Sequence, residues 1–262
     1  MAHTHVIYPN YVLANEIEDQ YNSRLDLMRF CTVDNSLVGV AGDTKKINVY
    51  TATNGTEKLT MGKGNTKSIE VCYADKEYKI LLAQNKFEYY DEEEMNDPLV
   101  VQTGVRHMAT DMFNTVQGDV FAEFGKATLT VNASAFDFGA FVDAGSVLDV
   151  ENIENLELFA FVAPEDMGAI RKGLKDDLKY VEAFVRSGYV GTVAGINLYT
   201  SKLATAGTIL GGTREAVTFF NKRGTEVEQE READIRLNTI YSRKYYLAAL
   251  TDATKAFKIV KA

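Results

Sequence analysis

The stretch DEEEMNDPLVVQTGVRHMATDMFNTVQGDVFAEFG, residues 91–125, decides the fold of this chain. Its apolar side chains recur every three or four residues, a spacing that places them on one face of an α-helix. They are Val101, Val105, Met108, Met112, Val116, Val120 and Phe124. The pattern predicts one amphipathic helix over residues 97–124, about 40 Å long at the rise of an α-helix.

Both ends of this helix carry residue types that suit a helix terminus. Asn96 or Asp97 can cap the first turn, and Pro98 fits the first helical position because that residue needs no backbone donor. Gly125 is a typical end signal. The acidic residues 91–94 are expected to be a solvated run favoured by the helix dipole, rather than a cation site.

Two alternating stretches before the helix predict a long β-hairpin. Polar and apolar residues alternate over residues 46–53 and again over residues 68–73, which is the period of a strand. The connecting segment, residues 54–67, is rich in Gly and Lys and forms a polar tip. A hairpin with so few large apolar residues buries too little surface to be stable alone, so we expect a partner chain to complete it.

The chain after the helix mixes short strand and helix patterns. The apolar run Leu156–Val162 predicts a buried strand, and Pro164 then opens a short helix. The glycine-punctuated stretch GYVGTVAGINLYTSK, residues 188–202, predicts short strands. The following TAGTILGGT, residues 205–213, is expected to be a loop.

The two ends of the chain carry weaker patterns. At the N-terminus, Ile17, Tyr21, Leu25 and Met28 have helical spacing, so we expect an arm that ends in a short helix. Near the C-terminus, four segments have strand character, and residues 226–232 are so highly charged that they resemble an exposed ribbon. The four segments are Ala216–Phe220, Thr225–Glu232, Lys244–Thr251 and Ala256–Lys261.

Composition sets limits on the class of protein. The chain has 262 residues, of which 46% are hydrophobic and 25% charged, with a formal net charge of −9. This acidity disfavours nucleic acid as the primary ligand. No apolar run is long enough to span a membrane and no secretory signal pattern begins the chain, so we expect a cytosolic protein. Cys31 and Cys72 form no CxxC motif and are expected to be buried fillers.

No group of residues has the pattern of a catalytic or cofactor site. His107 and Asp111 share a helical face, but no third ligand accompanies them, so an ion pair is expected rather than a metal site. The segment 207–214 has the glycine spacing of a phosphate loop, yet Thr213 and Arg214 stand where Lys and a hydroxyl residue are needed. Nucleophile-elbow, HExxH and GxGxxG motifs are absent as well. We therefore expect no enzyme, cofactor or metal site.

The order of these parts resembles the Hong Kong 97-like major capsid proteins of tailed phages. KFEYYDEEEMND, residues 86–97, resembles the family's link between extended loop and spine helix, and GYVGTVAGINLYTSK resembles a stretch of its axial domain. The closing segment, residues 212–260, has the family's order of aromatic strand, charged ribbon and Tyr-rich strand. The likeness covers nearly the whole chain.

This resemblance implies an α+β fold with named parts. They are an N-terminal arm (1–42), an extended loop (43–80), a peripheral domain with the spine helix (81–126), an axial domain (127–215), and closing strands of the peripheral domain (216–262).

The resemblance also implies the function. The chain is expected to self-assemble into pentamers and hexamers of an icosahedral phage head that encloses double-stranded DNA, in a virion assembled in the bacterial cytoplasm. A portal protein and a separate scaffolding protein are the expected partners, and no membrane is involved. An encapsulin-type nanocompartment shell shares the fold and is the alternative, and a small α/β enzyme is a more distant one.

Five residues are expected to contact neighbouring subunits. Lys58, Lys63 and Lys67 lie near the tip of the extended loop. Gly211 and Gly212 are expected in a loop close to the five- and six-fold axes.

Overall fold

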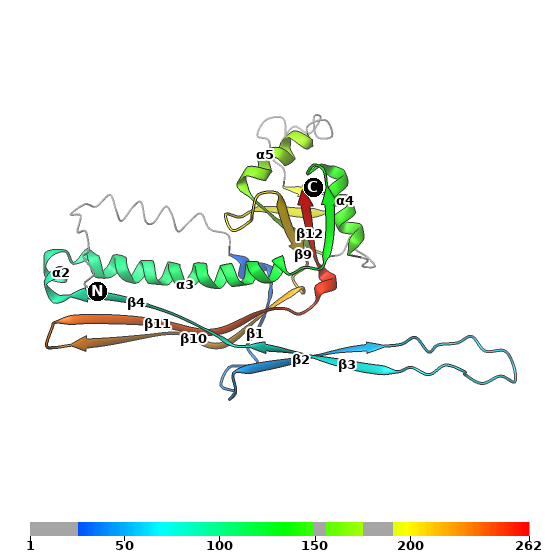
Figure 1. Cartoon of the computed structure of the whole chain (residues 1–262), viewed down its shortest axis with the longest axis horizontal. Helices are drawn as coiled ribbons and strands as arrows, with labels where there is room; N and C mark the ends of the chain where they lie inside the picture. Colours follow the sequence, from blue (N-terminus) through cyan, green and yellow to red (C-terminus); the bar gives the residue numbers. More distant parts are fainter. Residues whose placement is uncertain (1–25, 149–155, 175–190, 262) are drawn as a thin grey trace.

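Two sheets meet at one end of a long helix, and a two-stranded hairpin projects from their junction (Figure 1). The structure is a computed structural model that describes residues 26–148, 156–174 and 191–261. Helices and strands are both present and lie in separate layers, so the predicted α+β class is confirmed.

The long helix is α3 (Leu99–Gly125), as the 3.6-residue period predicted. The face formed by Met108, Met112, Val116, Val120 and Phe124 is buried. Val101 packs in a smaller cluster, whereas Val105 is 43% exposed, so the predicted stripe is broken at that one position.

The start of α3 differs from the prediction. The acidic run does not cap α3 but forms a separate short helix, α2 (Asp91–Asn96), and Pro98 is the N-cap residue of α3 rather than its first helical residue. The Tyr90 backbone N–H donates to the Glu93 carboxylate at 3.0 Å, which satisfies one free donor at the start of α2. Two helices form here because Asp97 has an extended backbone, which interrupts the helical path.

A four-stranded sheet lies along one face of α3 (Figure 1). In sheet order its strands are β1 (Thr32–Asp34), β10 (Val217–Glu232), β11 (Leu237–Leu250) and β4 (Leu81–Tyr90). Two predicted strands are in fact the single strand β10, and its register against β11 shifts between Asn221 and Glu226. Such irregularities bend a strand without ending it.

Side chains fix this sheet to the helix at several points. Asn85 of β4 donates its side-chain amide to the Met108 carbonyl at 2.8 Å. The Tyr246 hydroxyl on β11 donates to the Asp119 carboxylate, and burial together with this hydrogen bond raises the pKa of Tyr246. At Gly104 the helix approaches the Phe87 ring so closely that a Cβ atom would lie 2.4 Å from it.

A six-stranded sheet forms the second unit, beside the C-terminal end of α3 (Figure 1). In order its strands are β5 (Leu129–Ala133), β12 (Ala256–Lys261), β9 (Thr208–Gly212), β6 (Leu158–Val162), β8 (Ile196–Thr200) and β7 (Thr192–Val193). Helices α4 (Phe138–Val147) and α5 (Pro164–Gly173) belong to this unit. The predicted strand at 158–162 and helix from Pro164 are thereby confirmed.

The segment 205–213, expected to be a loop, contains the central strand β9. Gly211 and Gly212 are both buried, between the neighbouring strands β6 and β12. A Cβ atom at Gly211 would lie 2.4 Å from the Phe159 carbonyl oxygen, and one at Gly212 would lie 2.4 Å from the Lys255 carbonyl oxygen. The expected loop is therefore wrong: these two glycines lie in a strand and allow strands within one subunit to approach closely. Their contact with another subunit stays a prediction.

The last strand also lies elsewhere than expected. Residues 256–261 were assigned with the peripheral closing strands, but β12 pairs in parallel with β5 and antiparallel with β9. The short 3-10 helix η3 (Ala253–Lys255) joins β11 to β12, so the chain crosses from one sheet to the other at this point.

The hairpin consists of β2 (Thr44–Ala52) and β3 (Val71–Lys79), paired antiparallel from Thr44 opposite Lys79 to Ala52 opposite Val71. Its predicted existence is confirmed, although β3 begins two residues after Ile69. The hairpin extends away from both sheets and from α3 (Figure 1).

The predicted N-terminal helix falls mostly outside the described residues. Its one described member, Met28, belongs to the 3-10 helix η1 (Leu27–Phe30), whose N-cap residue Asp26 has an extended backbone. Of the two cysteines, Cys31 is buried as expected, whereas Cys72 is exposed on the hairpin. Burial raises the pKa of the Cys31 thiol to about 11, which keeps it neutral and unreactive.

We predict that Gly211→Asp prevents folding of the subunit itself. The side chain would collide with backbone atoms and bring a charge into the sheet, a cost of about 3 kcal/mol or more. The soluble yield and the urea midpoint of unfolding measure this effect. Gly118→Ala in α3 is the control, because its Cβ would meet nothing within 4 Å; it should retain or raise the midpoint, since Ala favours helix by about 1 kcal/mol. A soluble Gly211→Asp subunit with an unchanged midpoint would contradict the placement of β9.

Candidate assembly surface

In the part of the chain that the structure describes, the contacts that anchor the hairpin lie at its base. There, Ile47 and Tyr78 pack against the cluster that contains Phe220 and Leu247 of the four-stranded sheet. The Tyr78 hydroxyl donates to the Leu250 carbonyl at 3.1 Å. Beyond this base, described side chains of β3 from Val71 to Glu77 are exposed. The outer hairpin therefore has two sides available for contacts.

One side of the outer hairpin carries a row of apolar residues. Val71 and Tyr73 are two residues apart in β3 and so point to the same side of the strand, and Ile69 precedes the strand by two residues; the three are 63%, 69% and 61% exposed. Leu59 and Met61 add exposed apolar surface nearer the tip. We call Ile69, Val71 and Tyr73 the hairpin row. An isolated two-stranded hairpin is marginally stable in water, so an exposed apolar row of this kind is typical of a binding surface.

The three lysines predicted to make subunit contacts lie along the tip. Lys58, Lys63 and Lys67 are all exposed. They do not lie with Gly211 and Gly212, which are buried in the six-stranded sheet. The lysines thus give the hairpin tip a positive charge beside its apolar row, and a contact to a neighbour stays a prediction for them.

The opposite charge gathers at the far end of the four-stranded sheet, around α2. Asp91 accepts hydrogen bonds from Asn238 and Arg231, both at 2.6 Å. These two contacts, that from Asn238 first, lower the pKa of the Asp91 carboxyl. Arg236 pairs with Glu92 at 2.9 Å. Even with these two arginines, the run DEEEMND leaves this end of the molecule rich in carboxylates.

A second exposed apolar segment escaped the sequence analysis. The loop between β1 and β2 exposes Val38 (54%) and Val40 (51%), and two glycines in it, Gly39 and Gly42, have positive φ angles of 78° and 116°. Only glycine adopts these angles without strain. The signal in the sequence was the glycine-punctuated string SLVGVAG, which has no strand or helix period.

The structure offers no arrangement suited to metal or membrane chemistry in the part of the chain it describes. Among residues 26–148, 156–174 and 191–261, no three His, Cys, Asp or Glu side chains are grouped to hold a metal ion. Within the same residues no helix is long and apolar enough to cross a membrane. Asp111, which was expected to form an ion pair with His107, accepts a hydrogen bond from the Asn85 side-chain amide at 3.4 Å.

Several solved capsid structures share this architecture. The capsid of a native GTA particle matches with a TM-score of 0.71 at 14% identity, over 90% of this chain and 90% of that chain. The mature capsid of bacteriophage PhiM1 matches with a TM-score of 0.70 at 10% identity, over 99% of this chain and 91% of that chain. At this identity the likeness defines the fold, which is the Hong Kong 97-like capsid fold.

The sequence comparison points the same way. The chain is 29% identical to the major capsid protein of Staphylococcus phage phiMR11, over 95% of this chain and 92% of that protein. No family model matches the chain. Fold and relative together define the class: this is a structural capsid protein that forms a shell, and not an enzyme.

We predict that Val71→Ser combined with Tyr73→Ser weakens assembly without unfolding the subunit. Both side chains are exposed, so the free energy of unfolding should change by no more than about 0.5 kcal/mol. Light scattering should nevertheless show fewer or slower-forming shells, because each interface would lose apolar contact area. Lys76→Ser and Lys79→Ser, nearer the base of the same strand, are the matched control. Normal assembly of the Val71 and Tyr73 double variant would exclude the hairpin row as a contact surface.

Proposed function

We propose that this chain is the major capsid subunit of a tailed phage, and that it assembles into pentamers and hexamers of an icosahedral head enclosing double-stranded DNA. The observation that carries the proposal is a subunit whose hairpin reaches away from its own core with an exposed apolar row, within a capsid fold. A shell repeats the same contacts many times, so each contact can be weak and closure still be favourable.

Each part of the chain has its own role in assembly. The unit built on the six-stranded sheet is the axial domain and surrounds the five- and six-fold axes. The unit of α3 and the four-stranded sheet is the peripheral domain, and the extended loop reaches neighbouring subunits. Because β12 belongs to the six-stranded sheet, the axial domain includes residues 256–261 besides most of the range 127–215.

The extended loop lies over the spine helix α3 of a neighbouring subunit. The hairpin row supplies apolar surface for this contact, and α3 has exposed apolar side chains of its own at Leu99 (41%) and Val105 (43%). Charge also supports this contact. The tip carries lysines, and the segment 91–97 that precedes the helix is rich in acidic residues, so the two are complementary.

The negative charge of the subunit is consistent with a shell that encloses DNA. A subunit with a net charge of −9 repels phosphate groups, which limits adhesion of the packaged genome to the wall. The proposal includes a portal protein for DNA entry, a separate scaffolding protein, and assembly in the bacterial cytoplasm before release of the virion.

We expect the purified particles to contain nucleic acid when they are isolated from infected cells. Electron microscopy and the ratio of absorbance at 260 nm to that at 280 nm, measured before and after nuclease treatment of opened particles, test this. The encapsulin-type alternative shares the fold but encloses an enzyme, so a protein cargo in place of DNA would support that alternative. A small, monodisperse oligomer at every concentration would refute both.

Deletion of residues 52–66 should block shell closure while leaving the subunit folded. This deletion removes the tip and shortens the hairpin, but it leaves the base contacts of Ile47 and Tyr78 in place. Circular dichroism should therefore show intact secondary structure, and sedimentation should show capsomers or free subunits in place of shells. Normally closed shells from this variant would show that the extended loop makes no essential contact.

A further inference from the structure

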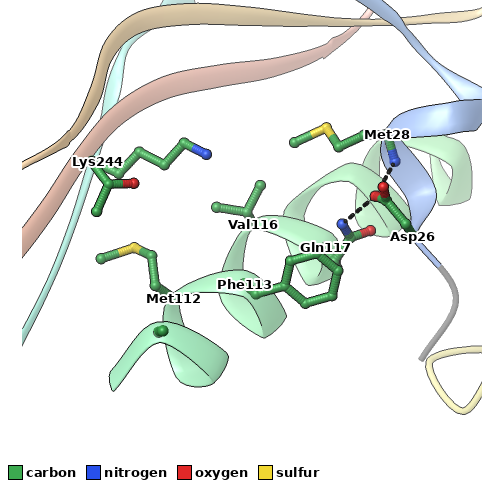
Figure 2. A pocket seen from close by; sticks show the side chains of 9 residues that line it. Asp26, Met28, Met112, Phe113, Val116, Gln117 and Lys244 are labelled. Carbon is green, nitrogen blue, oxygen red and sulfur yellow. Dashed lines mark hydrogen bonds between the residues drawn. The ribbon is translucent and has the colours of Figure 1, made fainter. Parts of the chain in front are cut away.

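A pocket of about 350 Å³ lies between α3, η1 and the strands β10 and β11 (Figure 2). Its apolar lining includes the buried side chains of Met112 and Val116 and the partly exposed side chain of Met28. Phe113 also lines it and remains 38% exposed. Apolar surface left in contact with water costs free energy in proportion to its area, so this pocket favours any segment that covers it.

The same pocket contains a lysine, Lys244, that has no anionic partner among the described residues. Lys244 extends from β11 toward Met28, across the space above Val116 (Figure 2). Within residues 26–148, 156–174 and 191–261, its amine forms no ion pair, and it lies 5.6 Å from the centroid of the Phe219 ring. Burial lowers the pKa of Lys244, as expected for an amine that has lost water without gaining a counter-ion.

The other charged residue of the pocket is already engaged. Asp26 accepts hydrogen bonds from the Met28 backbone N–H at 3.0 Å and from the Gln117 side-chain amide at 3.1 Å (Figure 2). The Leu27 backbone N–H donates to the Gln117 side-chain oxygen at 2.7 Å. Gln117 is only 3% exposed, so this network fixes the chain at the edge of the pocket, at the point where residues 1–25 join it.

We propose that residues 12–25 of the same chain bind in this pocket, with an apolar side chain against Met28 and Phe113 and a carboxylate beside Lys244. The segment VLANEIEDQYNSRL has the required chemistry: five large apolar or aromatic residues, and three acidic residues against one arginine, a net charge of −3 + 1 = −2. Its acidic residues are Glu16, Glu18 and Asp19.

The lengths also agree. Asp19 is seven residues from Asp26, and seven residues span about 10 Å in a helix or about 24 Å when extended. The pocket is lined by Asp26 itself, so either conformation reaches Lys244. A tethered segment has an effective concentration in the millimolar range, so modest contacts suffice to keep it bound. This argument favours the segment of the same chain over that of a second copy.

A single tryptophan provides the test, because the chain contains none. Phe113→Trp is introduced into the full chain and into a chain that lacks residues 1–22, both kept as unassembled subunits or capsomers. Acrylamide quenching of the indole should be at least about two-fold stronger in the shortened chain, since the tethered segment would keep the pocket covered in the full chain. Phe138→Trp on α4, 48% exposed, is the control and should be quenched equally in both chains.

Equal quenching of the Phe113→Trp reporter in both chains would overturn the proposal. To test whether the segment acts in trans, the shortened reporter chain is mixed with an excess of the full chain without tryptophan. Restored protection in that mixture, or protection in the full chain that disappears on dilution, would overturn binding within the same chain and assign the pocket to a neighbouring copy.

A full-length variant keeps the test valid if the shortened chain does not fold. Glu16→Gln, Glu18→Gln and Asp19→Asn together should increase quenching of the reporter, because Lys244 would lose its counter-ion. Lys244→Met added to this triple variant should restore protection, since no charge would then need a partner. If none of these four substitutions changes the quenching, a contact between Lys244 and the carboxylates of the segment is excluded.

Discussion

The fold depends on the place where the end of α3 meets the six-stranded sheet. Phe124 lies 5.6 Å from both Phe159 and Phe161 of β6, measured between ring centroids, and Phe30 lies 4.8 Å from Phe159. These rings belong to a buried cluster that also holds residues of β9, β10 and β11. Because the interior is close-packed, this aromatic contact fixes the angle between the two units of the subunit.

Strand β6 makes that junction possible by burying both of its sides. Leu158, Ala160 and Val162 face the core of the six-stranded unit, while Phe159 and Phe161 face α3. All five residues are buried. The strand therefore belongs to two cores at once, and a subunit built this way is rigid at its centre even though it is extended in outline.

The extremities lack such support. Among the side chains that the structure describes, those of β3 from Val71 to Glu77 are exposed, and the pocket beside α3 leaves Lys244 and Phe113 partly exposed. Both surfaces lie outside the aromatic junction. Both would be stabilised if another segment of protein covered them. A rigid centre with incomplete surfaces suits a shell subunit, because the centre keeps its shape while the surfaces can adapt to neighbouring subunits.

The sequence by itself determined the parts whose side chains repeat with one period. The helix over α3 followed from the spacing of Met108, Met112 and Val116, and the hairpin followed from the alternation around Val71. The order of these parts, together with the strings that resemble known capsid proteins, was enough to indicate the class. The exposed lysines of the tip could be named from the sequence because a charged, glycine-rich turn almost always lies at the protein surface.

Only the tertiary structure decided where the remaining strands pair. Gly211 and Gly212 suggested a loop, since glycine is a poor strand former when judged alone. In the fold they are central because β6 and β12 approach too closely for any side chain. The same holds for β12, whose partners β5 and β9 are far from it in the chain. Pairing between strands so far apart in the chain depends on how the other elements pack. A local pattern of apolar residues does not contain that information.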